Sequence, residues 1–190
     1  MGTTHGVAGV VVSEIDTGLV DRARAGDVEA FTQLLQHSDE AMRAVVWSVV
    51  HDQWLMDDVL QTAYEKAYRS IGGFRGDSSF RTWLYRICWT TAVDAVRQQQ
   101  RHRFEDVTTL ESRAATASGA TGTIAVVDFR RAWDRLPADQ RTALTLVAAE
   151  GLSHAEAAAV CGTRPGTIAA RVSRGRAALR ELLQTEGGRR

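Results

Sequence analysis

The sequence predicts an all-α protein built from two helical domains that a flexible linker joins, with a helix-turn-helix in the second domain. Almost every long segment repeats its apolar residues at the helical period, and no stretch shows the sustained alternation of a strand. Residues 107–123 are rich in Thr, Ser, Ala and Gly and lack an apolar period, which is typical of a linker. We therefore expect one domain at 18–103, a flexible linker at 104–123 and a second domain at 124–185.

Four apolar stripes predict the first four helices of the first domain. A short stripe after Asp16 and Thr17 precedes a second stripe that Asp27 can cap, and a separate helix follows near residues 42–50. The fourth helix runs from about Gln53 to Ser70. Its inner side carries Leu55, Val59, Leu60, Ala63, Tyr64, Ala67 and Tyr68. These helices can share one core.

The pair Gly72 and Gly73 ends this run, and a new helix follows a capping segment at residues 77–79. Aromatic rings alternate here with arginines, a combination suited to single-stranded DNA. The stripe of Phe80, Trp83, Leu84 and Ile87 has helical spacing, however, and is better explained as core. The remaining side chains form the candidate DNA-facing set: Phe74, Arg75, Asp77, Ser78, Ser79, Arg81, Tyr85, Arg86 and Trp89.

The second domain carries the pattern of a helix-turn-helix. Pro137 stops one helix, Ser153 caps a short one, and Gly162 ends it before a longer helix that begins near Pro165. The first turns of such a second helix meet base edges and phosphates in the major groove. Residues placed for this contact are Thr163, Arg164, Thr167, Arg171 and Arg174, while Ile168 and Val172 should face the core. The alternative is a plain helical hairpin with solubilising arginines.

A formal net charge of zero hides two basic zones and an acidic one. The segment from Glu14 to Asp58 contains ten acidic residues and three arginines. Residues 69–103 and 164–190 each contain seven arginines and two acidic residues. Charge alone does not distinguish a nucleic-acid surface from a solvated one. The acidic zone ends in a polar helix edge formed by Asp57, Asp58, Gln61 and Glu65, which cannot neutralise phosphate and suggests a protein partner.

The cysteines and the amino-terminal residues indicate the cellular compartment. Cys88 and Cys161 lie far apart, with no CxxC pair and no histidine cluster that could hold zinc. The apolar stretch at residues 7–12 is short, lacks a basic leader and runs into Glu14. We expect a reducing cytoplasm, no metal or cofactor, no signal peptide and no membrane insertion.

Four motifs resemble, in this order, the extracytoplasmic-function group of the sigma-70 family: DDVLQTAYEKA, FRGDSSFRTWLYRI, LPADQRTALTLVAAEGLSHAEAA and GTIAARVSRGRAALR. The resemblance spans roughly Leu19 to Leu183 apart from the linker. It implies a non-enzymatic sigma factor that directs RNA polymerase to promoters and helps open the DNA. Some relatives are held by an anti-sigma factor, so that partner is also compatible with the resemblance.

The resemblance also implies roles for particular residues. Asp58, Val59, Leu60 and Gln61 would contact the β′ clamp of core RNA polymerase, whose β subunit is a further partner. The DNA-facing set around residues 74–89 would capture and melt the minus-ten element. The helix-turn-helix, about Ser153 to Arg174, would read the minus-thirty-five element of promoter DNA, with the linker threading the polymerase between the two.

The chain departs from the family pattern in two places. Cys88 and Thr90 stand where relatives usually carry alanine and asparagine, so contacts of that asparagine are in doubt. Ala169 and Ala170 replace a basic residue and a serine, which predicts weaker or shifted reading of the minus-thirty-five element.

Other classes of protein remain as alternatives. A stand-alone dimeric helix-turn-helix regulator would need a dimer face and a palindromic site. An enzyme would have to use His51, His154, Cys161 or the pair Asp57 and Asp58, but adjacent helical positions point about 100° apart and do not converge on a substrate. A pure interaction protein that mimics a sigma domain would not explain two separate basic zones.

Overall fold

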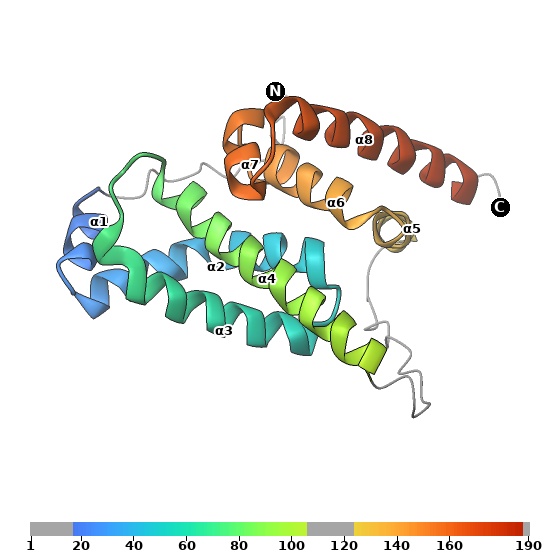
Figure 1. Cartoon of the computed structure of the whole chain (residues 1–190). Coiled ribbons are helices and arrows are strands. Elements are labelled where there is room, and N and C mark those ends of the chain that lie inside the picture. Colours follow the sequence, from blue (N-terminus) through green and yellow to red (C-terminus); the bar gives the residue numbers. More distant parts are fainter. Residues whose placement is uncertain (1–16, 106–123, 188–190) are drawn as a thin grey trace, which may run out of the picture.

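A computed structural model describes residues 17–105 and 124–187, and the elements assigned within these ranges are all helical. Helices α1 to α4 form the first domain and α5 to α8 the second (Figure 1). The first-domain elements are α1 (Thr17–Arg24), α2 (Val28–Val50), α3 (Gln53–Ser70), the 3₁₀ turn η1 (Ile71–Gly73) and α4 (Phe80–Glu105). The second-domain elements are α5 (Ile124–Asp134), α6 (Ala138–Leu144), the π-helical turn η3 (Thr145–Ala149), α7 (His154–Cys161) and α8 (Pro165–Gly187).

Helix α2 is one continuous helix, so the prediction of separate helices on either side of residues 36–41 is wrong. Within this polar run, buried Ser38 satisfies its hydroxyl by donating to Leu34 O at 2.9 Å, so the side chain is accommodated inside the helix packing. Gln36, His37 and Glu40 meanwhile face solvent. A polar run within a helix thus marked an exposed face and not a break.

Side-chain caps fix where the helices of the first domain begin. The Asp27 carboxylate accepts a hydrogen bond from Ala30 N at 3.0 Å and starts α2. Asp52 accepts from Trp54 N at 2.9 Å and from Leu55 N at 3.1 Å and starts α3. These bonds satisfy amide groups that have no partner within the helix. The acceptors hold the first turn of α3 in a defined position.

Helices α2, α3 and α4 pack against one another around the core of the first domain. Ring contacts and hydrogen bonds add to the apolar packing between α2 and α3. The rings of Phe31 and Tyr68 meet edge to face at 5.2 Å, and the Tyr64 hydroxyl donates to Asp39 Oδ1 at 2.5 Å. The sequence-predicted stripe is confirmed at Phe80 and Leu84, which are buried.

In the second domain, α8 crosses α6 at Gly175. A Cβ atom at this position would lie 2.9 Å from Leu144 Cδ1 and 3.3 Å from Gln140 Cβ. A larger residue would therefore require Leu144 and its neighbours to shift. The close crossing brings Ile168 and Val172 into the core, as their spacing predicted.

The two domains contact each other, and their buried apolar residues form one continuous core. Helix α7 packs on α4, and α6 packs on α2 (Figure 1). Arg141 of α6 reaches into the first domain, where its Nε donates to Ser48 O at 3.2 Å. The Ser48 hydroxyl lies 3.0 Å from that of Thr142, which adds a second polar bond across the boundary. This closed arrangement places residues of one domain over the candidate DNA-binding face of the other.

Candidate functional site

The polar edge of α3 presents only half of the residues predicted to meet a partner. Asp58 and Gln61 are exposed, but Val59 and Leu60 are 3% and 2% exposed and pack in the core. Asp57 is engaged as well, because Arg43 donates to it at 3.2 Å while also binding Asp39. We therefore assign Val59 and Leu60 a packing role and keep Asp58 and Gln61 as the surface.

Trp54 is a candidate contact residue that the sequence reasoning missed. Its side chain is 85% exposed, the highest value among the large hydrophobic residues of the described chain. At helical spacing it lies on the same side of α3 as Asp58 and Gln61. The signal was present, since an aromatic residue stood four positions before Asp58 and outside the apolar stripe. Exposed tryptophans of this kind are enriched at the centres of protein interfaces.

The loop between η1 and α4 presents polar residues and hides its aromatic one. Phe74 is buried, and its ring lies 6.1 Å from that of Phe80 and 5.3 Å from that of Trp83. Arg75, Asp77 and Ser78 are exposed. Phe74 consequently anchors the loop in the core, and the three exposed side chains are open to a ligand.

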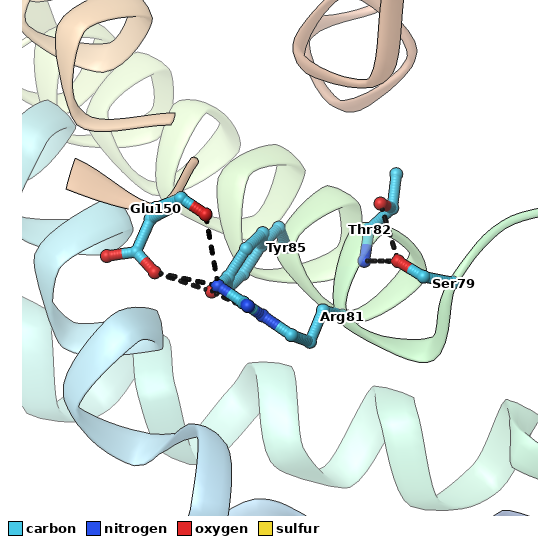
Figure 2. Close-up of polar contacts among 5 residues, drawn as sticks. All are labelled: Ser79, Arg81, Thr82, Tyr85 and Glu150. Carbon is cyan, nitrogen blue, oxygen red and sulfur yellow. Dashed lines mark hydrogen bonds and ion pairs between the residues drawn. The ribbon is translucent and has the colours of Figure 1, made fainter. Parts of the chain in front are cut away.

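Ser79 caps helix α4. Its hydroxyl oxygen accepts from Thr82 N at 3.1 Å and lies 2.8 Å from the Thr82 hydroxyl (Figure 2). A cap of this type satisfies an amide at the start of the helix. The side chain thus sets the direction in which α4 leaves the loop.

Two members of the predicted DNA-facing set, Arg81 and Tyr85, bind the second domain instead of facing solvent. Arg81 Nη2 donates to Tyr85 Oη at 2.8 Å and lies 3.2 Å from Glu150 Oε2, and the Tyr85 hydroxyl donates to the same Glu150 oxygen at 2.7 Å (Figure 2). Tyr85 is fully buried. Burial raises the pKa of the Tyr85 hydroxyl, and its bond to Glu150 adds to the rise. The hydroxyl therefore remains a donor.

Further along α4, the polar face is partly open. Arg86 is exposed and Trp89 is half-buried. Thr90, which replaces the family asparagine, turns its hydroxyl back and donates to Arg86 O at 2.8 Å. Its hydroxyl is therefore committed to the backbone of its own helix. The exposed members of the predicted set are therefore Arg75, Asp77, Ser78, Ser79 and Arg86.

The helix-turn-helix has the geometry that its sequence predicted. A capping box joins Ser153 and Glu156 at the start of α7, and Gly162 ends the helix with a left-handed φ of 59°. Pro165 then begins α8. Ser153 is thus occupied as a cap, since its hydroxyl accepts from Glu156 N at 3.2 Å and donates to the Glu156 carboxylate at 2.7 Å.

The predicted DNA-binding side chains of α8 and of the turn before it differ in how exposed they are. Arg164 and Arg174 are exposed, while Thr163 and Thr167 are half-buried. Arg171 is paired, because its Nε lies 3.0 Å from Asp139 Oδ2 of α6. Of the arginines predicted to meet DNA, Arg164 and Arg174 are therefore exposed, and Arg171 is available only if it leaves Asp139.

The two buried thiols are poorly suited to act as nucleophiles. Burial raises the pKa of Cys88 to about 12 and that of Cys161 to about 11. A thiol with such a pKa is almost entirely protonated near neutral pH. Within residues 17–105 and 124–187, no three His, Cys, Asp or Glu side chains are grouped so that they could hold a metal ion. The same described ranges contain no helix with the length and hydropathy of a membrane span.

Comparison with protein families matches both domains. Residues 34–102 match the model of Sigma-70 region 2, and residues 127–179 match that of Sigma-70, region 4. The chain is 36% identical to the RNA polymerase sigma-H factor of Pseudomonas aeruginosa, over 92% of this chain and 97% of that protein. It is 35% identical to the ECF RNA polymerase sigma-E factor of Escherichia coli, over 89% and 94% of the two chains.

Two solved structures share the fold. The sigma factor RpoE of Bartonella quintana, crystallised with the anti-sigma factor NepR, superposes with a TM-score of 0.71 at 32% identity, covering 83% of this chain and 98% of that one. CnrH in complex with the cytosolic domain of CnrY superposes with a TM-score of 0.65 at 27% identity, covering 90% and 98%. The order of the two matched regions is the order of the two domains.

Proposed function

This chain belongs to the sigma-70 family, as an alternative sigma factor of the extracytoplasmic-function group, and we propose that its two domains divide promoter recognition between them. The first domain, residues 18–103, binds core RNA polymerase and the minus-ten element. The second, residues 124–185, binds the minus-thirty-five element. The observation that carries this proposal is that each domain has exposed arginines where its matched region is predicted to meet DNA: Arg75 and Arg86 in the first, Arg164 and Arg174 in the second.

The polymerase-facing surface is the exposed edge of α3. Trp54 supplies an apolar anchor, and Asp58 and Gln61 supply charge and hydrogen-bonding groups beside it. An aromatic anchor with a polar rim is the usual composition of a tight protein interface. Val59 and Leu60 support this edge from the core. The proposed partner is the β′ clamp of core polymerase, with the β subunit contributing elsewhere.

The minus-ten strand meets the loop before α4. Arg75 and Arg86 can neutralise phosphates, and Asp77 and Ser78 can bond to an unpaired base. Phe74 and Ser79 hold the loop in place, and half-buried Trp89 lies one turn after Arg86 on α4. Unpairing costs a few kcal/mol per flipped base, which a specific pocket can offset. This step requires no covalent chemistry from the chain.

The minus-thirty-five element meets the first turns of α8. Arg164 and Arg174 reach phosphates or base edges, and Thr163 and Thr167 lie between them. Ser153 orients α7 as its cap. The replacement of a basic residue and a serine by Ala169 and Ala170 leaves fewer polar contacts on this face. Reading of the element then depends on these two arginines and on Arg171 once it is released from Asp139.

The two solved structures support regulation of this chain by a protein inhibitor. RpoE was crystallised with the anti-sigma factor NepR, and CnrH with the cytosolic domain of CnrY. We propose that this chain also binds an inhibitor of this kind. We further propose that it acts in the cytoplasm without catalysis. A mixture of this chain with a candidate inhibitor should then lose its ability to bind core polymerase.

The test of the proposed function is in vitro transcription from a genomic fragment library with bacterial core polymerase. We expect discrete new start sites that share two upstream elements and that disappear when the chain is omitted. Gln61→Ala should reduce all of them, and Arg174→Ala should reduce those that depend on the upstream element. No new starts, together with a stable DNA-binding dimer of the free chain, would replace the proposal with a dimeric regulator.

A further inference from the structure

A polar network of four side chains joins helices α2 and α3. Arg43 of α2 donates from Nε to Asp39 Oδ2 at 2.9 Å and from Nη1 to Asp57 Oδ1 of α3 at 3.2 Å. The Tyr64 hydroxyl of α3 donates to Asp39 Oδ1 at 2.5 Å. The bonds therefore run from the early part of α3 to α2 and return to α3 two turns later.

The two residues of α3 in this network lie on either side of Gln61, a proposed contact with polymerase. Asp57 stands four residues before Gln61 and Tyr64 stands three residues after it, so the three side chains are neighbours on one face of the helix. Gln61 is exposed, whereas Asp57 and Tyr64 are bonded to α2. The network thus holds the surface of α3 before and after Gln61.

Each hydrogen bond in the network has a charged partner. Burial acts to raise the pKa of Asp39, but the hydrogen bonds from Tyr64 and Arg43 outweigh it, and the pKa lies below its ordinary value. The bond to Asp39 raises the pKa of Arg43 in turn. Bonds to charged groups are stronger than bonds between neutral ones. A single exposed ion pair contributes little, but here one guanidinium joins two carboxylates in a network.

We propose that Arg43 and Asp39 are positioning residues, which hold α3 in the orientation that Gln61 needs in order to bind core RNA polymerase. This inference rests on the proposed function of the α3 edge and adds two residues of α2 that act through it. A surface that is ordered before binding loses less conformational entropy when it binds. The side chains of Arg43 and Asp39 are 45% and 42% exposed, so the apolar core beneath them should stay packed when the network is broken.

The test uses full-length variants and bacterial core polymerase. Surface plasmon resonance measures affinity, and hydrogen exchange with mass spectrometry measures the local order of residues 53–66. Arg43→Gln removes both ion pairs, and Arg43→Lys keeps the charge without the forked donor. Arg24→Gln is the matched control, because the partly exposed Arg24 pairs with Asp21 of its own helix at 3.3 Å. Urea denaturation confirms that each variant is folded under the assay conditions.

We expect Arg43→Gln to bind core polymerase about fivefold more weakly than wild type. Amide exchange in residues 53–66 should become faster, because α3 loses a link to α2 on that face. Arg43→Lys should lose part of the affinity, and Arg24→Gln should match wild type in both measurements.

A double-mutant cycle separates positioning of Gln61 from a general loss of stability. The Arg43→Gln/Gln61→Ala variant should bind almost as well as Gln61→Ala alone, because the side chain that Arg43 helps to place is already missing. Losses that add in full would show that Arg43 acts independently of Gln61 and would overturn the proposal.

Wild-type affinity of Arg43→Gln would also overturn the proposal, and so would an equal loss in Arg24→Gln. These results differ from a failure of the proposed function. In that case the wild-type chain itself does not bind core polymerase, whereas here the wild type binds and only the comparison of variants fails.

Discussion

The hydroxyl of Tyr85 donates a hydrogen bond to Glu150 Oε2 at 2.7 Å, joining two residues that lie 65 positions apart in the chain. Tyr85→Phe deletes this donor and one of the acceptors that Arg81 uses. We expect the free energy of unfolding to fall by about 1 kcal/mol and the radius of gyration to rise. Tyr64→Phe is the matched control, because its hydroxyl bonds to Asp39 within the first domain. It should cost similar stability in urea denaturation without any expansion.

Neighbouring positions on α3 should respond to substitution in opposite ways. Leu60→Ala removes a side chain that is 2% exposed, and we expect a loss of about 2 to 5 kcal/mol in unfolding free energy. Gln61→Ala should leave urea denaturation unchanged within about 0.5 kcal/mol and weaken binding to core polymerase. If Leu60→Ala were as stable as wild type and defective only in binding, the packing role would be wrong.

Trp54 should behave as an interface anchor. Trp54→Ala removes an 85% exposed ring, so the unfolding free energy should stay within about 0.5 kcal/mol of wild type. Affinity for core polymerase, measured by surface plasmon resonance, should fall about 30-fold, the effect of losing about 2 kcal/mol. Val28→Ala provides the control, since Val28 is an exposed apolar residue on α2. Equal effects of the two substitutions would contradict a specific role for Trp54.

The arginines of α8 should separate into free and paired groups. Arg174→Ala should weaken binding of a minus-thirty-five duplex and lower the slope of log affinity against log salt by about 1, without loss of stability. Arg171→Ala also breaks the pair with Asp139 and should cost at most about 1 kcal/mol of stability. Asp139→Asn frees Arg171 and should strengthen duplex binding. A weakening in that variant would argue that Arg171 does not reach DNA.

His51 lies at the contact between the domains and should make the stability of the protein depend on pH. Burial, followed by the charge of Arg141, lowers the pKa of His51 below its ordinary value of 6.5, although Asp134 Oδ1 lies 3.5 Å from its Nδ1. The unfolded chain therefore binds a proton that the folded one releases. The stability that neutral His51 contributes is present above pH 6.5 and is lost as the pH falls through the folded pKa.

The pH dependence can be measured with His51→Asn, because asparagine tolerates the left-handed φ of 51° at this position. Urea midpoints at about pH 7.5 and about pH 5.5 should differ more for wild type than for His51→Asn. Identical differences for the two proteins would show that His51 does not contribute.

The sequence predicted helix faces well, because the period of an α-helix determines which residues point inward. Ile168, Val172, Phe80 and Leu84 are buried as expected. The capping residues Asp27 and Ser153 also begin their helices. Each of these predictions depends on residues within a few positions of one another.

The partners of side chains that cross between helices could not be predicted in this way. Tyr85 and Arg171 were assigned to DNA, yet Tyr85 bonds to Glu150 in the turn after η3 and Arg171 pairs with Asp139 of α6. No local pattern reports such a neighbour. Val59 and Leu60 were assigned to a surface through a motif, although their own apolar spacing had already placed them on the inner side of α3.

The polar groups between the domains have a consequence for aggregation. Ser48, Thr142, Arg81 and Glu150 are groups that water solvates well, and they are interleaved with the apolar contacts at the boundary. When the domains part, these groups interrupt the newly exposed surface and keep it from forming one continuous apolar patch. In a chain whose domains have parted, we therefore expect these groups to oppose association through the exposed faces.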